Sequence, residues 1–375
     1  MEIKMVDLKS QYLKIKNEID EGIQKVIDTT SFIKGPAVQE FQLGLEKYLN
    51  VRHVIPCGNG TDALQIAMMA LDLKPGDEVI TASFTYVATA EVIALLGLKP
   101  VLVDVDRDSF LIRPDEIEAA ITPKTRAIVP IHLFGQCADM EAILEIAKKH
   151  NLYVIEDTAQ AMGAEFTFSD GTVKKAGCMG DIGCTSFFPS KNLGCYGDGG
   201  AMYTDDEILA KKLRMIANHG QSIQYHHDII GVNSRLDAIQ AAILNAKLPY
   251  LDTYNGSRQK AALFYDKAFS SCKKVKTPIR VSNSTHVFHQ YTLQLAEDVD
   301  RNKLRQYLTE KGIPSMVYYP VPLHRQKAYM DEFNKDEKFP ISNYLSGCVL
   351  SLPMHTELSE NQLNYIAETI LSFFE

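Results

Sequence analysis

One lysine in this sequence lies where its amine could act as a nucleophile. Lys191 follows an apolar segment that ends in Phe187, Phe188 and Pro189, and glycines follow it at positions 194, 197, 199 and 200. Apolar neighbours lower the proton affinity of an amine, and the unprotonated amine attacks an aldehyde. Glycines also mark ordinary turns and an isolated loop lysine is usually solvated, but the two features together favour a nucleophile.

An acidic residue, Asp157, follows a second apolar segment at residues 152–156. A carboxylate at the end of a strand either caps a helix or pairs with a cation. Pyridoxal phosphate requires such a carboxylate, because a protonated pyridine nitrogen turns the ring into an electron sink for a substrate carbanion. Asp157 is therefore a candidate partner of that ring nitrogen.

A glycine-containing turn at residues 56–61 opens a helical pattern. The backbone amides of Gly60, Thr61 and Asp62 would lie at the start of the helix, where N–H groups attract a phosphate, and the Thr61 hydroxyl would add a donor. The turn matches neither the nucleotide-binding loop nor the dinucleotide fingerprint, so the phosphate need not belong to a nucleotide. Simple capping of the helix is the alternative.

Six apolar runs alternate with helical patterns, which predicts a mainly parallel α/β sheet. The runs are residues 77–81, 100–104, 126–130, 152–156, 184–188 and 200–204, and the helices between them are predicted at 61–71, 88–96, 140–150 and 206–217. Ligands of such sheets bind at the carboxyl ends of the strands, so polar residues that follow each run are candidates for the site.

Near residue 250 the sequence changes to strand patterns punctuated by proline and to charged helical patterns, which predicts two domains. Residues 1–250 would form a large cofactor-binding domain, and residues 251–375 a smaller C-terminal α/β domain. A long helix is predicted from residue 233 to about 251, a strand at 288–295, and helices at 300–311 and 359–374.

Composition excludes several classes of protein. The chain has 375 residues, 46% of them hydrophobic, which suffices for a large core. Its seven cysteines are scattered and form no C-x-x-C pair, so we expect reduced thiols and no metal site. A net charge of −8 without a dense basic cluster argues against nucleic acid as a partner. Without a signal peptide or an apolar stretch of membrane length, we expect a soluble cytoplasmic protein with no membrane partner.

Eight segments, in order along nearly the whole chain, resemble the sugar-nucleotide aminotransferases of the DegT/DnrJ/EryC1/StrS family. They are Ser31-Phe-Ile-Lys-Gly-Pro36, Asn59-Gly-Thr-Asp-Ala-Leu64, Phe84-Thr-Tyr-Val-Ala-Thr89, His132-Leu-Phe-Gly-Gln136, Glu156-Asp-Thr-Ala-Gln160, Ser186-Phe-Phe-Pro-Ser-Lys191, Asn233-Ser-Arg-Leu-Asp237 and Tyr319-Pro-Val-Pro-Leu-His324. The resemblance implies a type I pyridoxal-phosphate-dependent aminotransferase fold, similar to aspartate aminotransferase.

The resemblance also implies roles for individual residues. Lys191 aligns with the catalytic lysine that binds pyridoxal phosphate as a Schiff base, and Asp157 with the partner of the ring nitrogen. Gln160 falls near the ring hydroxyl of the cofactor, and Tyr86 where an aromatic ring stacks on the pyridine. The implied phosphate-binding residues are Gly60, Thr61, Ser186 and Asn233. Asn233 matches a residue that reaches over from the neighbouring subunit, which implies a homodimer with shared active sites.

Within the family the chain most resembles a subgroup that aminates UDP-2-acetamido-2-deoxy-3-oxo-glucuronate for surface polysaccharides, with glutamate as donor. Arg235, Tyr318 and Tyr319 fall on its substrate-binding positions. A guanidinium offers two parallel donors to a carboxylate, so Arg235 suits a uronate. Tyr318 departs from the subgroup, where a histidine is expected, which leaves the sugar specificity open.

Three alternatives remain. The substrate could be another nucleotide-linked keto-hexose, with the ketone at C3 or C4. A sugar dehydratase of this family carries histidine in place of the lysine, and Lys191 argues against it. A regulator that binds pyridoxal phosphate or a sugar nucleotide without turnover would be expected to show a basic DNA-binding segment, and none is evident.

Overall fold

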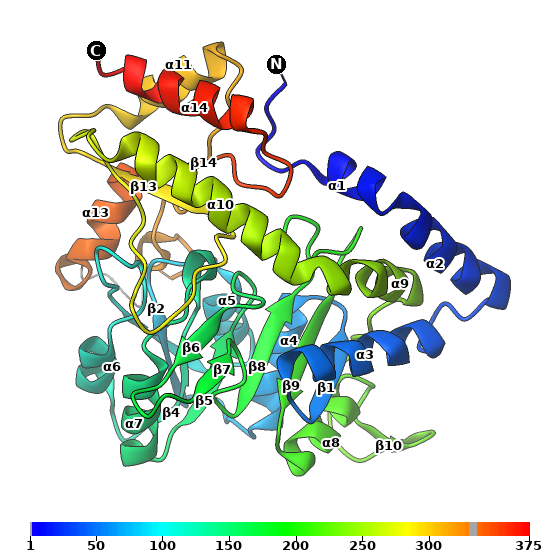
Figure 1. Cartoon of the computed structure of the whole chain (residues 1–375). Coiled ribbons are helices and arrows are strands. Elements are labelled where there is room, and N and C mark those ends of the chain that lie inside the picture. Colours follow the sequence, from blue (N-terminus) through cyan, green and yellow to red (C-terminus); the bar gives the residue numbers. More distant parts are fainter. Residues whose placement is uncertain (1, 330–335) are drawn as a thin grey trace.

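Seven strands form the central sheet, in the order β1-β9-β8-β5-β4-β2-β3. Their bounds are β1 His53–Cys57, β2 Glu78–Ala82, β3 Lys99–Val103, β4 Thr125–Val129, β5 Tyr153–Asp157, β8 Ile182–Ser186 and β9 Gly200–Thr204. Only β9 runs against the others, because it pairs antiparallel with both β1 and β8. The computed structural model describes residues 2–329 and 336–375 (Figure 1), and the predicted α/β fold with a mainly parallel sheet is confirmed.

Each of the six predicted strands overlaps an observed strand, whereas β1 was not predicted. β1 contains Pro56, and a proline inside an apolar run argues against a central strand. The structure places β1 at the edge of the sheet, where it pairs with β9 alone. A missing N–H group is tolerated at an edge, so the proline is compatible with the strand.

Helices cover both faces of the sheet. One face packs against α4 (Gly60–Ala70), α5 (Ala88–Leu95) and α8 (Glu207–Ile216), and the other against α6 (Pro114–Ala120) and α7 (Met140–His150). Successive residues of β2 therefore enter different cores, with Val79 in the first and Ile80 in the second. A strand buried on both faces is apolar throughout, which explains why its run was recognisable in the sequence.

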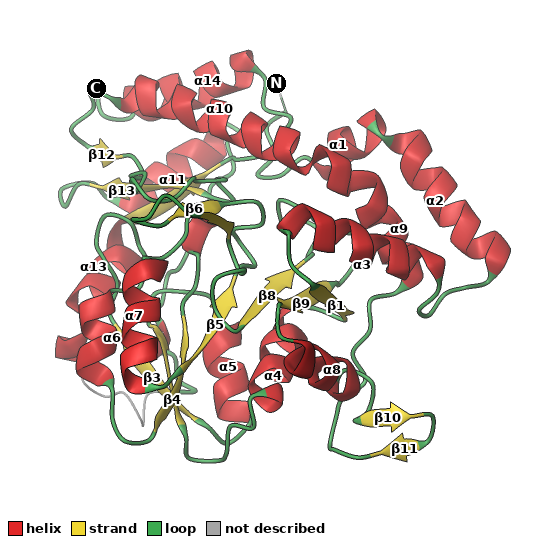
Figure 2. Cartoon of the chain, turned by 60° about the horizontal axis from the view of Figure 1, so that its bottom comes forward, coloured by secondary structure: helices red, strands yellow, loops and turns green. Residues whose placement is uncertain are grey.

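Three N-terminal helices lie beside one end of the sheet: α1 (Leu8–Lys14), α2 (Lys16–Thr29) and α3 (Pro36–Leu49). Both α2 and α3 pack on α9 (Ala238–Lys247). The hairpin of β10 (Gln221–Ile223) and β11 (His226–His227) projects away from the body of the protein (Figure 2).

The helix predicted to begin at residue 233 begins only at Ala238. The backbone is extended before it, because Asn233 pairs with Asn218 and Asp237 pairs with Ile33 in isolated bridges. A short 3-10 turn, η2 (Leu248–Tyr250), then separates α9 from α10 (Leu251–Phe269). The prediction of one long helix from 233 to 251 was wrong, since Asn233 and Asp237 form bridges that keep this segment out of the helix and η2 interrupts the rest.

A second, three-stranded sheet follows α10. It consists of β12 (Val275–Lys276), β13 (Tyr291–Leu295) and β14 (Val349–Leu352), all antiparallel. Side chains of this sheet share an apolar cluster with α10, α11 (Arg301–Glu310) and α14 (Glu360–Ser372). This apolar cluster is distinct from the clusters around the large sheet. The predicted boundary between two domains at residue 250 falls in η2 and stays a prediction. The remaining elements are η1 (Leu133–Gly135), β6 (Glu165–Thr167), β7 (Val173–Lys175), η3 (Leu323–Arg325), η4 (Asp336–Lys338) and α13 (Pro340–Cys348).

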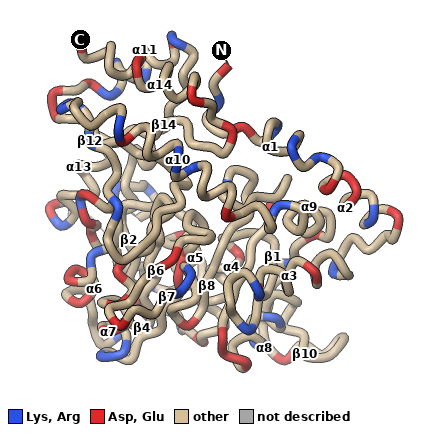
Figure 3. The backbone as a smooth tube through the Cα atoms, in the orientation of Figure 1, with Lys and Arg blue, Asp and Glu red and all other residues tan. Residues whose placement is uncertain are grey.

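Charged residues of both signs are interspersed along the outer helices and loops (Figure 3). No helix in the described ranges is long and apolar enough to cross a bilayer. All seven cysteines are free thiols.

Candidate active site

A cavity of about 490 Å³ lies where β5 and β8 end and α4 begins. Nine of the residues predicted for the site line it: Gly60, Thr61, Tyr86, Asp157, Gln160, Ser186, Lys191, Tyr318 and Tyr319. These residues come from five separate parts of the chain and meet at the carboxyl edge of the sheet, as expected for a ligand site in an open α/β sheet. Asn233 and Arg235 do not line this cavity.

Lys191 lies in a tight turn after β8, where its N–H group donates to the Phe188 carbonyl at 2.8 Å. Burial lowers the pKa of Lys191 to about 8, although the nearby Asp157 carboxylate acts in the opposite direction. Near neutral pH a lysine with this pKa is unprotonated far more often than an exposed lysine. The direction of this pKa shift is the one expected from the apolar neighbours of Lys191 in the sequence.

Asp157 is the last residue of β5. Its carboxyl accepts a hydrogen bond from the Thr89 hydroxyl at 3.1 Å and another from the Ala159 N–H group at 3.1 Å. Burial raises the pKa of Asp157, while these bonds and the charge of Lys191 partly offset it. A buried carboxylate held in place and short of positive charge is suited to receive a cationic N–H group. Thr89 had no role assigned from the sequence.

The turn before α4 brings backbone donors to the cavity. Asn59 caps the helix, because its side chain accepts from the Asp62 N–H group at 2.8 Å. The expectation that the Asp62 amide binds phosphate was therefore wrong, since the cap already occupies it. Gly60 and Thr61 retain first-turn N–H groups, which have no acceptor within a helix. A Cβ at Gly60 would lie 2.7 Å from the Ser186 Cβ, so only glycine lets the ends of α4 and β8 approach this closely.

Gln160 joins two parts of the cavity wall. Its side-chain oxygen accepts from the Phe134 N–H group at 2.8 Å, and its amide donates to the Tyr319 hydroxyl at 2.9 Å. Burial raises the pKa of Tyr319, which stays a neutral phenol. The Tyr86 ring is 60% exposed at the mouth of the cavity, with its centroid 6.5 Å from that of Tyr319. An exposed aromatic ring beside a cavity can stack on a bound ring.

Sequence reasoning missed His289, which lines the cavity although it is only 6% exposed. Burial, with smaller contributions from Lys191 and Arg258, lowers the pKa of His289 well below its usual range. The imidazole is therefore neutral, and its Nε2 lies 3.4 Å from the amide nitrogen of Gln290. The residue lies just before β13, and the only signal in the sequence was its place in an alternating run.

Arg235 lines a second cavity of about 600 Å³. Three further cations line it, Lys34, Lys211 and Arg214. No acidic residue of the described chain lines the cavity, although Lys211 forms an ion pair with Glu207 at 3.3 Å. Between Asn233 and Arg235, the Ser234 hydroxyl accepts from the Gly58 N–H group at 2.9 Å and donates to Asp62 at 2.6 Å. Ser234 thus anchors the segment to the turn before α4, while Asn233 is exposed.

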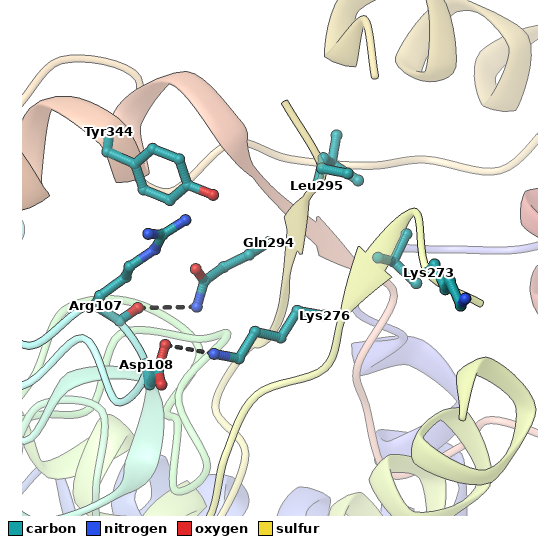
Figure 4. A pocket seen from close by; sticks show the side chains of 9 residues that line it. Arg107, Asp108, Lys273, Lys276, Gln294, Leu295 and Tyr344 are labelled. Atoms are coloured by element: carbon teal, nitrogen blue, oxygen red, sulfur yellow. Dashed lines mark hydrogen bonds and ion pairs between the residues drawn. The ribbon is translucent and has the colours of Figure 1, made fainter. Parts of the chain in front are cut away.

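A third cavity, of about 380 Å³, contains none of the residues predicted for the site (Figure 4). Two of its three cations, Arg107 and Lys276, already have partners within the protein. Lys276 forms an ion pair with Asp108, and the Arg107 guanidinium lies 4.0 Å from the centre of the Tyr344 ring. The described residues also contain no cluster of three His, Cys, Asp or Glu side chains that could bind a metal.

Comparison with known proteins matches residues 13–371 to the model of the DegT/DnrJ/EryC1/StrS aminotransferase family. A Pseudomonas aeruginosa UDP-2-acetamido-2-deoxy-3-oxo-D-glucuronate aminotransferase is 46% identical over 98% of this chain and 99% of its own. A Geobacillus stearothermophilus protein named pleiotropic regulatory protein is 45% identical over 100% of this chain and 99% of its own. An Acidithiobacillus ferrooxidans UDP-N-acetyl-3-dehydro-alpha-D-glucosamine 3-aminotransferase is 44% identical over 98% and 97%.

Solved structures share the whole fold. The Streptomyces venezuelae DesV structure superposes with a TM-score of 0.95 at 36% identity and covers 100% of this chain and 99% of its own. The Bacillus subtilis NtdA structure, solved with its bound cofactor PMP, has a TM-score of 0.88 at 33% identity and covers 96% and 82%.

Proposed function

Because this chain belongs to the DegT/DnrJ/EryC1/StrS aminotransferase family, we propose that it transfers the amino group of glutamate to UDP-2-acetamido-2-deoxy-3-oxo-glucuronate. The protein is a pyridoxal-phosphate-dependent sugar-nucleotide aminotransferase, as the family and its relatives are. Its sugar substrate and its amino donor are the proposal. Relatives that act on dTDP-linked and GDP-linked sugars make a neutral keto-hexose the competing substrate.

The cavity around Lys191 fits pyridoxal phosphate. Lys191 offers an amine for the aldehyde, Asp157 a carboxylate for the ring nitrogen, and the start of α4 offers N–H groups for the phosphate. When bound, this cofactor supplies an electron sink for breaking a bond at the carbon that bears the amine. We assign two roles to Lys191. It would bind the cofactor covalently, and its Nζ would transfer a proton between the amine-bearing carbon of the substrate and the aldehyde carbon of the cofactor. Asp157 would keep the ring nitrogen protonated.

Other residues would hold the cofactor in place. Gly60, Thr61 and Ser186 are assigned to its phosphate, so that the ring end can move while the phosphate stays fixed. Tyr86 would stack on the ring, and Gln160 would lie beside its hydroxyl group.

The observation that carries the choice of an acidic sugar is the second cavity. It collects four cations, including Arg235, and of these Lys211 alone is ion-paired within the described chain, with Glu207. A uronate linked to a nucleoside diphosphate carries charge on both the sugar and the diphosphate, so it matches such a lining better than a neutral sugar does. A guanidinium can also bind the planar uronate carboxylate through two parallel hydrogen bonds.

The location of that cavity outside the Lys191 site supports a homodimer with shared sites. Asn233 is exposed and Arg235 half-buried on either side of Ser234, which anchors the segment to its own subunit, so we assign both side chains to the site of a neighbouring subunit. Exposed apolar side chains also lie on the projecting hairpin, where Ile223 is 71% and Tyr225 is 82% exposed. Large exposed apolar side chains are typical of surfaces that bind a partner.

Hybrid dimers test this arrangement. Lys191→Ala and the double variant Asn233→Ala/Arg235→Ala are each expected to be inactive. After subunit exchange, one site of each hybrid would combine an intact Lys191 with intact Asn233 and Arg235, so about a quarter of all sites should be active in a symmetric dimer. Activity is measured before and after exchange, which is verified by mass spectrometry. Absence of recovery after complete exchange contradicts shared sites.

Substitution of Arg235 by lysine tests the acidic sugar. Lysine keeps the positive charge but loses the paired donors, so we expect the 3-keto uronate to bind more weakly by roughly 1–3 kcal/mol. The half-reaction with glutamate should change less, and a neutral keto-hexose with the same nucleotide should be unaffected. The measurement compares kcat/KM of wild type and variant on both sugars. Equal losses on the two sugars would show that Arg235 recognises the diphosphate, and the proposed substrate would lose its main support.

A further inference from the structure

A buried lysine on α9 has no part in the site described above. Lys247 is 1% exposed, and its ammonium donates to the Gly194 carbonyl at 2.5 Å and lies 5.2 Å from the centre of the Tyr196 ring. Within the described residues it has no carboxylate partner, and burial lowers its pKa to about 8. Removing an ammonium from water costs several kcal/mol, which one carbonyl and one aromatic face offset only in part. Such a position calls for a reason other than stability.

The carbonyl that Lys247 binds belongs to the turn that carries Lys191. This turn closes through the Cys195 N–H group, which donates to the Phe187 carbonyl at 2.8 Å. Gly194 fits because a Cβ there would lie 2.4 Å from the Pro189 carbonyl oxygen. The chain therefore turns back on itself between Phe187 and Cys195. Lys247 binds this turn at Gly194, three residues after Lys191.

Further hydrogen bonds hold the same turn. Asn192, next to Lys191, donates to the Asn255 side chain on α10 at 2.7 Å and to the Val287 carbonyl at 3.0 Å. Gln240 on α9 accepts from the Tyr196 N–H group at 2.8 Å. Gln240 and Lys247 are seven residues apart, so they lie on one face of their helix. The two consecutive helices therefore fix the turn at three points.

We propose that Lys247 is a positioning residue for transamination, which acts through the Gly194 carbonyl to hold the Lys191 amine where it meets the cofactor aldehyde. The inference rests on the proposed role of Lys191. This role accounts for the burial of a cation in an apolar region. The Lys247 ammonium is a strong donor, and it fixes the Gly194 carbonyl in the turn that carries the reactive Lys191 side chain. Precise positioning of a reacting group can raise the reaction rate by a large factor, because even a small displacement of that group slows the reaction.

The test replaces Lys247 by methionine, which fills the same space without charge, and uses Lys260→Met on the exposed face of α10 as the matched control. Methionine removes the cost of burying a charge but leaves the Gly194 carbonyl without its donor, and because these two effects oppose each other the melting temperature of the cofactor-free protein should stay close to that of wild type. The rate at which added pyridoxal phosphate becomes covalently attached, followed by absorbance, should drop about 10-fold or more. The turnover number should fall by a similar factor, with little change in the KM of the sugar.

Lys247→Gln is the second variant, because its shorter, neutral amide fills part of the site but leaves the Gly194 carbonyl without its donor. We expect the same slow attachment. A normal attachment rate in either folded variant overturns the proposal, as does a loss of attachment that only follows a lower melting temperature. If neither variant folds, Lys247 is a folding requirement and the proposal is equally overturned. Lys191→Ala separates the two proposals, because covalent attachment that persists in that variant refutes the role of Lys191 itself.

Discussion

Lys191→Ala should abolish transamination and leave the fold intact. One side chain is assigned both the covalent attachment of the cofactor and the proton transfer, so we expect turnover to fall by roughly 10,000-fold or more, the upper range for loss of a general acid–base group. The Lys191 amine has no hydrogen-bond partner among the described residues, and burial already disfavours its charged form. The cofactor-free variant should therefore melt no lower than wild type.

The measurement combines conversion of glutamate to 2-oxoglutarate with the absorbance of the attached cofactor. Lys174→Ala removes an exposed lysine on β7 and should match wild type in both. Turnover near the wild-type rate in Lys191→Ala, with undiminished absorbance, would falsify the assignment of the catalytic lysine.

Much of the site could be predicted from the sequence, because its residues are local features of strands and turns. Lys191 and Asp157 each follow an apolar run of the buried sheet, and parallel strands bring such ends to one edge. The turn at Gly60 is equally local, since a helix start provides its own donors. The resemblance added Tyr86, Gln160 and Ser186, which chemistry alone would not have distinguished from ordinary core or strand residues.

Contacts between distant segments could not be predicted in this way. His289 reaches the cavity from just before β13, about 100 residues beyond Lys191, and nothing in its alternating run distinguishes it from a core residue. The burial of Lys247 could not be predicted from the sequence either, since a lysine at the end of an amphipathic helix is normally solvated. The start of α9 was placed too early because Asn233 and Asp237 form bridges with other loop segments, at Asn218 and at the distant Ile33, which the helical pattern does not reveal.

Burial gives the cavity its electrostatic character. Asp157 is a carboxyl whose pKa burial raises, Lys191 an amine whose pKa burial lowers, and His289 a neutral imidazole. All three shifts disfavour charge while the cavity contains only protein. A bound pyridinium N–H group beside Asp157 would reverse the first shift, because an opposite charge lowers the pKa of a carboxyl. The carboxylate and the protonated ring would then stabilise each other.

Asp157→Asn tests that mutual stabilisation and should have the second-largest effect. The amide keeps the size of the side chain but no longer favours a protonated ring, so we expect turnover to fall roughly 100- to 1000-fold, the scale for removing one preorganised electrostatic group. Cofactor attachment should largely persist, since Lys191 and the start of α4 are unchanged. Thr89→Val is the matched control: it removes one hydrogen bond to the same carboxylate, worth about 1 kcal/mol, and should slow turnover by only about 5-fold. Unchanged turnover in Asp157→Asn would remove Asp157 from the site, and an equal loss in both variants would mean that the position of the carboxylate matters more than its charge.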